Sequence, residues 1–295
     1  MANSRRITTQ SNIITPNITG IQSVGGYVSS PWSSINPHNI QVSGATLIQP
    51  VAQPANLFNA FKPKRAGKNP KLSHIVFVLD ESSSMSNCWD QTISGYNEYL
   101  KAQREDAEKT GIETLVSLYK FNGYDVKAIF DRQNVQEVQP LDKNSYRPKG
   151  GTNLHDAMGG VMMKINSLLT EKKKDDRESV IITVLTDGEE NSSRTFMGTD
   201  IKAMVEKAEA KNWGFMFLGA NIDAFHAGSA LGFNMNNTMQ FATANAAETM
   251  RGASAMTSRM KGAYASGMDT GSTYVATAFN DTERAMAVGD NDAGK

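Results

Sequence analysis

The chain has 295 residues, of which 39% are hydrophobic, and its 30 basic and 30 acidic side chains give a formal charge of zero. This length suits one domain with extensions or two small domains, and the single cysteine, Cys88, excludes a disulfide scaffold and an all-cysteine zinc site. No stretch approaches the roughly 18 apolar residues of a membrane span, the first residues lack the apolar region of a secretory signal, and net neutrality argues against nucleic acid as a partner.

The charge is distributed unevenly along the chain. No Asp or Glu precedes Asp80, whereas residues 1–79 hold seven cations. Residues 80–295 therefore carry 23 basic and 30 acidic side chains, a formal charge of −7. Seven of the nine prolines also lie in the first 70 residues. This composition predicts an extended, basic, Pro/Ser/Asn-rich arm over residues 1–71, in which short apolar pieces such as 12–14 and 45–48 can add to a sheet as edge strands or lie in grooves.

From residue 72 onward, predicted strands and helices alternate. Runs of β-branched and aromatic residues predict strands over 73–79, 114–121, 126–130, 180–185 and 213–218. Apolar residues at helical spacing predict helices over 91–109, 154–169, 201–210 and roughly 244–263. Asn122-Gly123 is a hairpin signal. The last 28 residues are small and polar, apart from an apolar clump at Tyr274, Val275, Ala278 and Phe279 that can dock on the domain or on a neighbour.

This alternation indicates an α/β fold: a doubly wound, mostly parallel sheet covered on both faces, with one antiparallel edge strand supplied by the hairpin. We expect three parts, namely the arm (1–71), the α/β domain (72–235) and a C-terminal helix with a polar tail (236–295). Ligand sites in such sheets lie at the carboxyl ends of the strands, where the strand order reverses. Asp80 and Asp187 each lie at such an end.

Three short segments place oxygen donors at these strand ends. They are Asp80-Glu81-Ser82-Ser83-Ser84, Lys149-Gly150-Gly151-Thr152 and Thr186-Asp187-Gly188. Glycine allows the second and third loops to pass close to the first. Hard oxygen donors with several hydroxyls suit Mg²⁺ or Mn²⁺. The candidate metal ligands are Asp80, Ser82, Ser84, Thr152 and Asp187.

These motifs resemble the metal-ion-dependent adhesion site (MIDAS) of von Willebrand factor A (VWA) domains, which combines DxSxS with a threonine and an aspartate from two further loops. The resemblance covers about residues 72–235. It implies the doubly wound VWA/Rossmann-like fold and a metal that takes a carboxylate from a partner protein. The segments TDGEENSSR (186–194) and FMFLGANIDA (215–224) are similar to stand-alone VWA proteins of bacteria and phages. The chain departs from the family pattern at Ser83, where Gly is common, and at Glu81, an anion that would tune metal affinity or face solvent.

Other interpretations of the same residues explain less. Asp80 and Asp187 can instead cap following helices, and Thr152 or Asn153 can start the helix from Leu154. A phosphoaspartyl hydrolase needs an Asp where Ser82 stands, a P-loop needs its lysine after the glycines, and neither motif serine has a histidine at readable spacing for a hydrolase triad.

Several neighbouring residues have simpler expected roles. We expect Asp156 to be a first-turn helix carboxylate, His155 a satisfied or exposed histidine, and Cys88 a small buried or half-buried residue. Packing roles in terminal helices are expected for the methionines at 235, 239, 250, 256, 260 and 268.

The sequence therefore favours a non-enzymatic, metal-dependent protein-binding or adhesion module whose partner presents an acidic side chain. A second hypothesis is a structural or decoration protein of a phage virion, whose arm staples it to neighbouring subunits or to further copies of itself. The opposite charges of arm and domain agree with such self-association, which salt would weaken. A third hypothesis is an intracellular accessory factor of an ATPase or a stress-resistance system. The expected location is the cytoplasm or a virion.

Overall fold

The computed structural model describes residues 59–67, 71–220 and 222–289, together with the backbone of residues 47 and 48. Most of the predicted arm, including the apolar piece at 12–14, lies outside these residues. No helix in the described part of the chain is long and apolar enough to cross a membrane.

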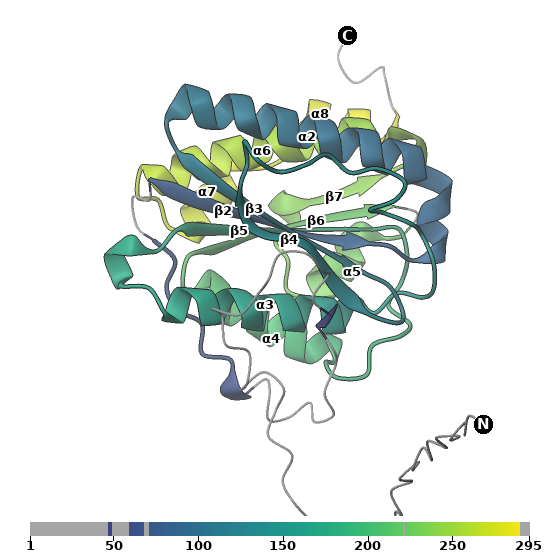
Figure 1. Ribbon diagram of the computed structural model, residues 1–295, viewed down its shortest axis with the longest axis horizontal. Helices are drawn as coiled ribbons and strands as arrows, with labels where there is room; N and C mark the ends of the chain where they lie inside the picture. The colour runs from purple at the N-terminus through teal and green to yellow at the C-terminus, as the bar shows by residue number, and fades with distance from the viewer. Residues whose placement is uncertain (1–46, 49–58, 68–70, 221, 290–295) are drawn as a thin grey trace, which may run out of the picture. The chain divides into compact units, whose positions relative to one another are not determined.

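A central sheet organises the domain (Figure 1). Its strands are β1 (Leu47–Ile48), β2 (Leu72–Asp80), β3 (Glu113–Phe121), β4 (Val126–Asn134), β5 (Ser179–Thr186), β6 (Trp213–Ala220) and β7 (Thr238–Phe241). They lie in the order β1-β4-β3-β2-β5-β6-β7. β4 is antiparallel to β3, whereas β3, β2, β5, β6 and β7 run parallel. The five predicted strands and the predicted fold class are confirmed.

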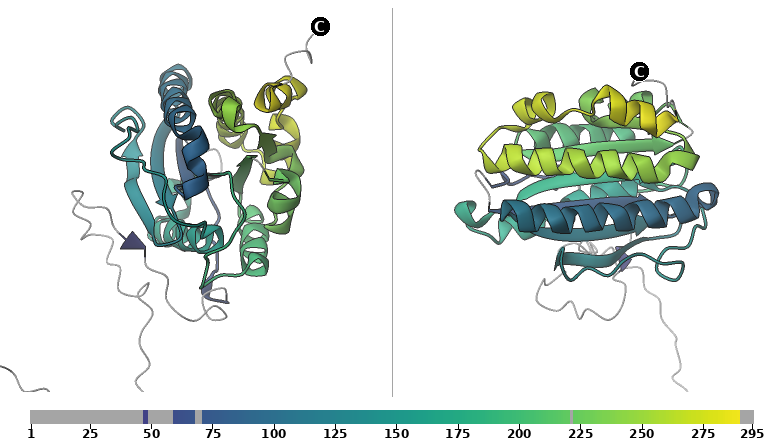
Figure 2. Two further views of the ribbon diagram at one scale, coloured as in Figure 1. Left: turned by 90° about the vertical axis from the view of Figure 1, so that its right-hand side faces the viewer. Right: turned by 90° about the horizontal axis from the view of Figure 1, so that it is seen from above.

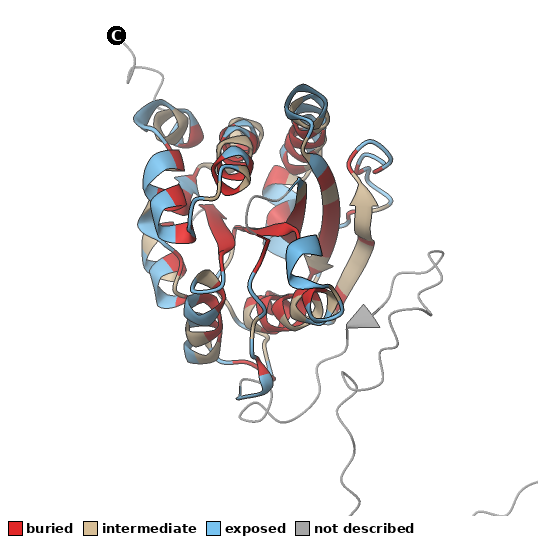
Figure 3. Ribbon diagram, turned by 90° about the vertical axis from the view of Figure 1, so that its left-hand side faces the viewer, coloured by how far each residue is buried: buried red, intermediate tan, exposed pale blue. Residues whose placement is uncertain are grey.

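Helices cover both faces of this sheet (Figures 1 and 2). One face carries α2 (Trp89–Thr110), α6 (Ala246–Ala265) and α8 (Asp281–Val288), with α7 (Thr270–Thr277) packed beside α6. The other face carries α3 (Leu154–Thr170), α4 (Gly198–Glu209) and α5 (Ala224–Ala230). The short 3-10 turns are η3 (Ser83–Cys88), η4 (Lys174–Asp176), η5 (Met235–Asn237) and η6 (Thr243–Asn245). Figure 3 shows buried residues on the sheet side of the helices and exposed residues on their outer sides.

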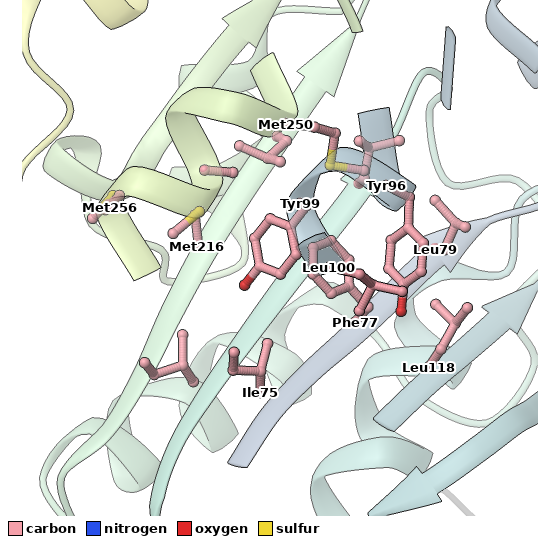
Figure 4. Close-up of a cluster of buried hydrophobic side chains, with 14 of the residues drawn as sticks. Ile75, Phe77, Leu79, Tyr96, Tyr99, Leu100, Leu118, Met216, Met250 and Met256 are labelled. Atoms are coloured by element: carbon pink, nitrogen blue, oxygen red, sulfur yellow. The ribbon is translucent and has the colours of Figure 1, made fainter. Parts of the chain in front are cut away.

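The central strands are buried along their length because helices exclude water from both faces. All eight residues of β5 and of β6 are buried. Under α2, the ring of Phe77 packs edge-on against Tyr96 and Tyr99, with centroids 5.1 and 4.8 Å away (Figure 4). A core of this density holds the strand ends, and thus the side chains that follow them, in fixed positions.

Four short elements differ from the sequence-based expectation: α5, β7, α7 and α8. The predicted helix over 244–263 is confirmed as α6, but residues 238–241 before it form β7, which is too short to show a period of two. In the C-terminal apolar clump, Tyr274 and Phe279 are buried against the domain, whereas Val275 is exposed. Among the six methionines, Met235 and Met268 are exposed and the packing prediction was wrong for these two, because both lie in short connections outside the long helix.

Two pieces of the N-terminal region join the domain. Leu47 and Ile48 pair with Val126 and Lys127 at the start of β4, which confirms the edge strand predicted for 45–48. Residues 59–67, which we call the basal clamp, cross the amino ends of the strands. Phe61 is 1% exposed and packs edge-on against Trp213 at 6.1 Å.

Backbone hydrogen bonds hold the basal clamp in place. Ala66 N donates to the carbonyl of Lys211 (2.7 Å), and Gly67 N donates to the carbonyl of Glu178 (2.8 Å). Trp213 Nε1 donates to the carbonyl oxygen of Lys64 (2.8 Å). The clamp is therefore anchored directly before the starts of β5 and β6.

Candidate metal centre

The order of the strands creates one point where loops diverge. β2 is central, β3 lies on one side of it and β5 on the other, so the connections after β2 and β5 leave the sheet in opposite directions. This reversal opens a crevice at the carboxyl ends of the strands. Asp80 is the last residue of β2, and Asp187 follows the last residue of β5.

The first motif loop is organised around Asp80. Its Oδ1 accepts a hydrogen bond from the backbone N of Ser82 (2.7 Å), and its Oδ2 accepts one from Thr186 Oγ1 (2.6 Å). Asp80 thereby ties the end of β2 to the end of β5. The chain then turns into η3, so Ser82 and Ser84 follow within one short turn.

The hydroxyls of this loop reach the third motif directly. Ser82 Oγ lies 3.0 Å from Ser84 Oγ, and Ser84 Oγ donates to Asp187 Oδ1 at 2.6 Å. Because the proton of the Ser84 hydroxyl is used in this bond, Ser84 Oγ accepts from Ser82 Oγ and keeps one lone pair for another group. Three of the five predicted ligands are thus in hydrogen-bond contact, although Asp187 follows the two serines by more than 100 positions in the chain.

Thr152 approaches the same point from the second loop. A Cβ on Gly188 would lie 3.2 Å from Thr152 Oγ1 and 3.4 Å from Ser84 Oγ, so Gly188 leaves room for both hydroxyls. No hydrogen bond joins Thr152 directly to the other four candidates among the interactions of the described residues. Its loop is instead held by Asn191, whose Oδ1 accepts from Thr152 N (2.9 Å) and whose own N donates to the Thr152 carbonyl (3.0 Å).

Both carboxylates at this point are buried. Asp80 is 0% exposed and Asp187 is 5% exposed. Burial raises the pKa of Asp80 to about 6, against the lowering effect of its hydrogen bonds from Thr186 and Ser82. Burial likewise raises the pKa of Asp187. Neither forms an ion pair with a cation of the described residues, and Asp187 Oδ2 is a buried oxygen with no hydrogen-bond partner there.

This donor set fits a hard divalent cation. Two carboxylates whose negative charge is uncompensated, with hydroxyls whose lone pairs are free, match the oxygen preference of Mg²⁺ and Mn²⁺. The unpartnered Asp187 Oδ2 is the observation that a purely structural arrangement leaves unexplained. The described residues hold no cluster of three or more His, Cys, Asp or Glu side chains, so any such centre depends on the serine and threonine hydroxyls.

Helix capping does not account for these side chains. The residue before α3 is Asn153 rather than Thr152, and Asn153 makes no side-chain cap bond. Ser82 precedes η3 without a capping bond from its side chain. The helix-cap interpretation therefore lacks the required hydrogen bonds at Ser82 and Asn153, whereas Asp80 does accept from the backbone N of Ser82 within its own loop.

Glu81 has a role that the sequence did not reveal. It is 1% exposed, so it does not face solvent. Its carboxylate accepts from Lys120 Nζ (2.6 Å), from the backbone N of Arg147 (2.7 Å) and from Asn122 Nδ2 (3.1 Å). Unlike Asp80, Glu81 is neutralised by a cation and joins the ends of β2 and β3 to the second loop.

A second set of positioning residues follows Asp187. Glu190 accepts from the backbone N of His155 (2.9 Å) at the start of α3 and from Ser193 N (2.7 Å) in its own loop. Asp156 accepts from the backbone N of Arg194, Thr195 and Phe196, at 2.8 to 2.9 Å. The prediction that Asp156 is a first-turn helix carboxylate is confirmed. The acidic and amide residues within TDGEENSSR were the available signal for this network.

The remaining alternatives have little structural support. Cys88 is 0% exposed, as expected for a buried residue, and burial raises its pKa to about 11, so its thiol is a poor nucleophile. No histidine of the described residues hydrogen-bonds Ser82 or Ser84. His155 is half-buried, and burial lowers its pKa despite the nearby Glu190.

The fold and the site define a doubly wound α/β domain with an oxygen-rich centre at its topological switch point. The sequence profile of the von Willebrand factor type A domain matches residues 74–256. The chain belongs to this family. No curated protein sequence matches the chain.

Solved structures with a similar fold are distant in sequence. The proximal thread matrix protein 1 of the mussel byssus is 14% identical, with a TM-score of 0.45 over 65% of this chain and 48% of its own. The pilus adhesin SpaC of Lactobacillus rhamnosus GG is 12% identical, with a TM-score of 0.49 over 66% and 32%. The manganese-loaded TRAP protein of Plasmodium vivax is 14% identical, with a TM-score of 0.41 over 61% and 72%. The chain thus spans about half the length of the mussel protein.

Proposed function

We propose that this protein is a non-enzymatic protein-binding module that uses a divalent cation, Mg²⁺ or Mn²⁺, held by Asp80, Ser82, Ser84, Thr152 and Asp187. When bound, the cation supplies an open coordination position for a carboxylate oxygen of the partner. The observation that carries this proposal is the contact between Ser84 and Asp187, which leaves a buried carboxylate oxygen without a partner. Membership of the VWA family supports it, because the five residues match that family's metal site.

The candidate ligands and the residues that orient them have different roles in this proposal. The serine and threonine hydroxyls offer neutral oxygens, and the two aspartates supply negative charge. Thr186 and the backbone N of Ser82 orient Asp80, and Asn191 orients the loop of Thr152. These supporting bonds hold the donors before the cation arrives, which reduces the entropy lost on binding.

The metal claim is tested by titrating Mg²⁺ and Mn²⁺ into the purified chain by calorimetry. We expect binding at one site, and a loss of about tenfold or more in affinity for Asp187→Asn and for Asp80→Ala. Asp90→Asn is the matched control, because the Asp90 side chain is 71% exposed and pairs only with Lys143. Equal affinity for the wild type and Asp187→Asn would end the proposal.

A second candidate function is a structural subunit, as in a phage virion, that joins its neighbours through the N-terminal arm. It is favoured by the pairing of Leu47 and Ile48 with β4, which shows that an arm segment can extend the sheet edge. Beyond Val126 and Lys127, the outer edge of β4 pairs with no strand of the described residues. Removal of residues 1–46 should abolish self-association in light scattering if the arm joins subunits, and should leave the oligomeric state unchanged if it does not.

A further inference from the structure

One aromatic side chain is exposed beside the candidate metal centre. Tyr124, in the hairpin between β3 and β4, is 75% exposed. The other large hydrophobic side chains with high exposure in the described residues are methionines and valines. A single exposed tyrosine is common on protein surfaces. The contacts that hold Tyr124 in place therefore determine whether it can take part in binding at the candidate centre.

The backbone of Tyr124 is fixed by a buried residue. Asn122 Oδ1 accepts from the backbone N of Tyr124 (3.0 Å), and Asn122 Nδ2 donates to Glu81 Oε2 (3.1 Å). Asn122 is 0% exposed. The hairpin is therefore hydrogen-bonded to Glu81, which lies between the candidate ligands Asp80 and Ser82.

The ring of Tyr124 lies directly on the second metal loop. A Cβ on Gly150 would come within 2.7 and 2.9 Å of two ring carbons of Tyr124, which places the ring against this glycine, and the φ of +75° at Gly150 favours glycine there. The carbonyl oxygen of Gly150 accepts from the backbone N of Ser83 (3.0 Å). The ring thus lies on the loop that carries Thr152, and Gly150 connects this loop by a hydrogen bond to the loop that carries Ser82 and Ser84.

The charges around this ring restrict what it can bind. Arg147 and Lys149 are exposed on the loop that carries Gly150. The guanidinium of Arg147 donates to the carbonyl of Lys143 and to Asn144 Oδ1, whereas Lys149 forms no ion pair within the described chain. Asp125, next to Tyr124, is already paired with Lys127 (2.9 Å). An uncharged planar ring can stack on Tyr124, and an additional acid can pair with Lys149.

We propose that Tyr124 is a specificity-determining residue of the partner site. The partner segment that presents an acidic side chain at the metal centre carries an aromatic side chain within two positions of it, which stacks on Tyr124, and further acidic residues near Lys149. This inference rests on the proposed function, since it assumes that the acidic side chain is captured at the centre. Because the hairpin is already fixed, stacking costs little ordering of Tyr124 and should strengthen binding about 3- to 10-fold.

The test uses a display library of random peptides with a fixed central Asp, selected on the full chain in saturating Mg²⁺. We expect enrichment of Trp, Tyr or Phe next to the Asp on the wild type and on Tyr124→Phe, which keeps the ring. On Tyr124→Ala, the enrichment should disappear, and the best wild-type peptide should bind about 3- to 10-fold more weakly. Val275→Ala is the matched control, because Val275 is 76% exposed on α7.

The outcomes separate this inference from the proposed function. Each variant is first titrated with Mg²⁺, and Tyr124→Ala should bind the cation as the wild type does. If the wild type binds no Mg²⁺, the proposed function fails. If Mg²⁺ binds but no aromatic residue is enriched, or if the enrichment persists on Tyr124→Ala, the role of Tyr124 is overturned while the metal centre stands. Recovery of no peptide by a Mg²⁺-bound chain also overturns it.

Discussion

Both ends of the sheet contain buried carboxylates, and these carboxylates differ in whether a cation neutralises them. At the carboxyl ends of the strands, Asp80 and Asp187 meet hydroxyls and backbone N–H groups and form no ion pair with a described cation. At the amino ends, Glu178 is 0% exposed and meets Arg132 Nη1 and Lys172 Nζ, the latter at 2.7 Å. The comparison teaches that charge balance, rather than burial, distinguishes Glu178 from the two carboxylates that we propose to take a cation.

The amino-end arrangement requires a local distortion of the sheet. Arg132 has a φ of +52°, and the register of β4 against β3 shifts between Val116 and Leu118, as expected of a β-bulge. This conformation is unfavourable for a residue with a Cβ, and it is maintained where Arg132 reaches Glu178. Burial and the nearby cations hold the pKa of His74 well below 6.5, so His74, whose Nδ1 is 3.8 Å from Glu178, remains neutral.

Removal of Phe61 should have the largest effect on the amino end. Phe61→Ala deletes a ring that is 1% exposed against Trp213, so we expect a loss of about 3–5 kcal/mol in the free energy of unfolding, measured with urea. Mg²⁺ affinity should not change in the variant that remains folded, because the basal clamp lies at the opposite end of the strands. Asn59→Ala, an exposed change in the same segment, is the control. Equal stability of both variants would show that the clamp does not belong to the fold.

Neutralisation of Glu178 should be nearly as damaging. Glu178→Gln leaves Arg132 and Lys172 without their anion, and loss of one partner in a buried ion pair costs about 3 kcal/mol. Unfolding in the presence of a chelator measures this cost without any contribution from bound metal. Glu108→Gln, an exposed change on α2, should shift stability by less than about 0.5 kcal/mol. A Glu178→Gln variant as stable as this control would remove the basis of the comparison.

Glu209 provides an intermediate case at the amino end. It accepts from Tyr274 Oη (2.8 Å) and has no cation partner in the described chain, and burial raises its pKa to about 7. Because its folded pKa lies above the unfolded value of 4.5, its contribution to stability is complete below about pH 4.5 and is lost as the pH rises through about 7.

Glu209→Gln should remove this dependence on pH. Gln keeps an acceptor for Tyr274, so the variant should match the wild type near pH 4 and exceed its free energy of unfolding by about 1–3 kcal/mol near pH 8. Urea unfolding of both proteins at the two pH values measures the difference, in which all other titrating groups cancel. A difference that does not depend on pH would mean that Glu209 ionises normally.

The smallest effect is expected at the carboxyl end without metal. Asp187→Asn replaces an unpartnered buried oxygen and removes an uncompensated charge, while its remaining oxygen can still accept from Ser84. In chelator, the variant should therefore be within about 1 kcal/mol of the wild type, or more stable. Addition of Mg²⁺ at about 100 times the wild-type Kd should stabilise the wild type by about 2.7 kcal/mol and Asp187→Asn by about 1.4 kcal/mol or less. A large loss of stability in chelator would indicate a structural role for Asp187.

The sequence predicted the parts of this molecule that depend on long runs of residues. β2 and β5 are almost wholly apolar and end in Asp80 and Thr186, so their ends could be placed and the three motifs assigned to one edge of the sheet. The convergence of Ser84 and Asp187 follows from that placement. The exact contacts do not, because no local pattern states which hydroxyl meets which carboxylate.

The remainder depends on contacts that leave no periodic signal. Glu81 could not be assigned because its partners lie on β3 and in a distant loop. The bulge at Arg132 inserts a single residue, which the strand pattern does not record. Phe61 stands in a polar, proline-rich segment, where composition favours an extended arm, and only its contact with Trp213 shows that this part belongs to the domain.

The placement of the basal clamp and the metal centre at opposite ends of the same strands has a mechanical consequence. In the proposed function, a pull between a partner at the candidate centre and the basal clamp itself runs along the strands. β2 pairs in register with β3 from Leu72 to Asp80 and with β5 from Ser73 to Leu79. Such a force loads these hydrogen bonds together in shear, rather than opening them one after another. The candidate centre and the basal clamp are therefore connected through strands whose hydrogen bonds lie in parallel.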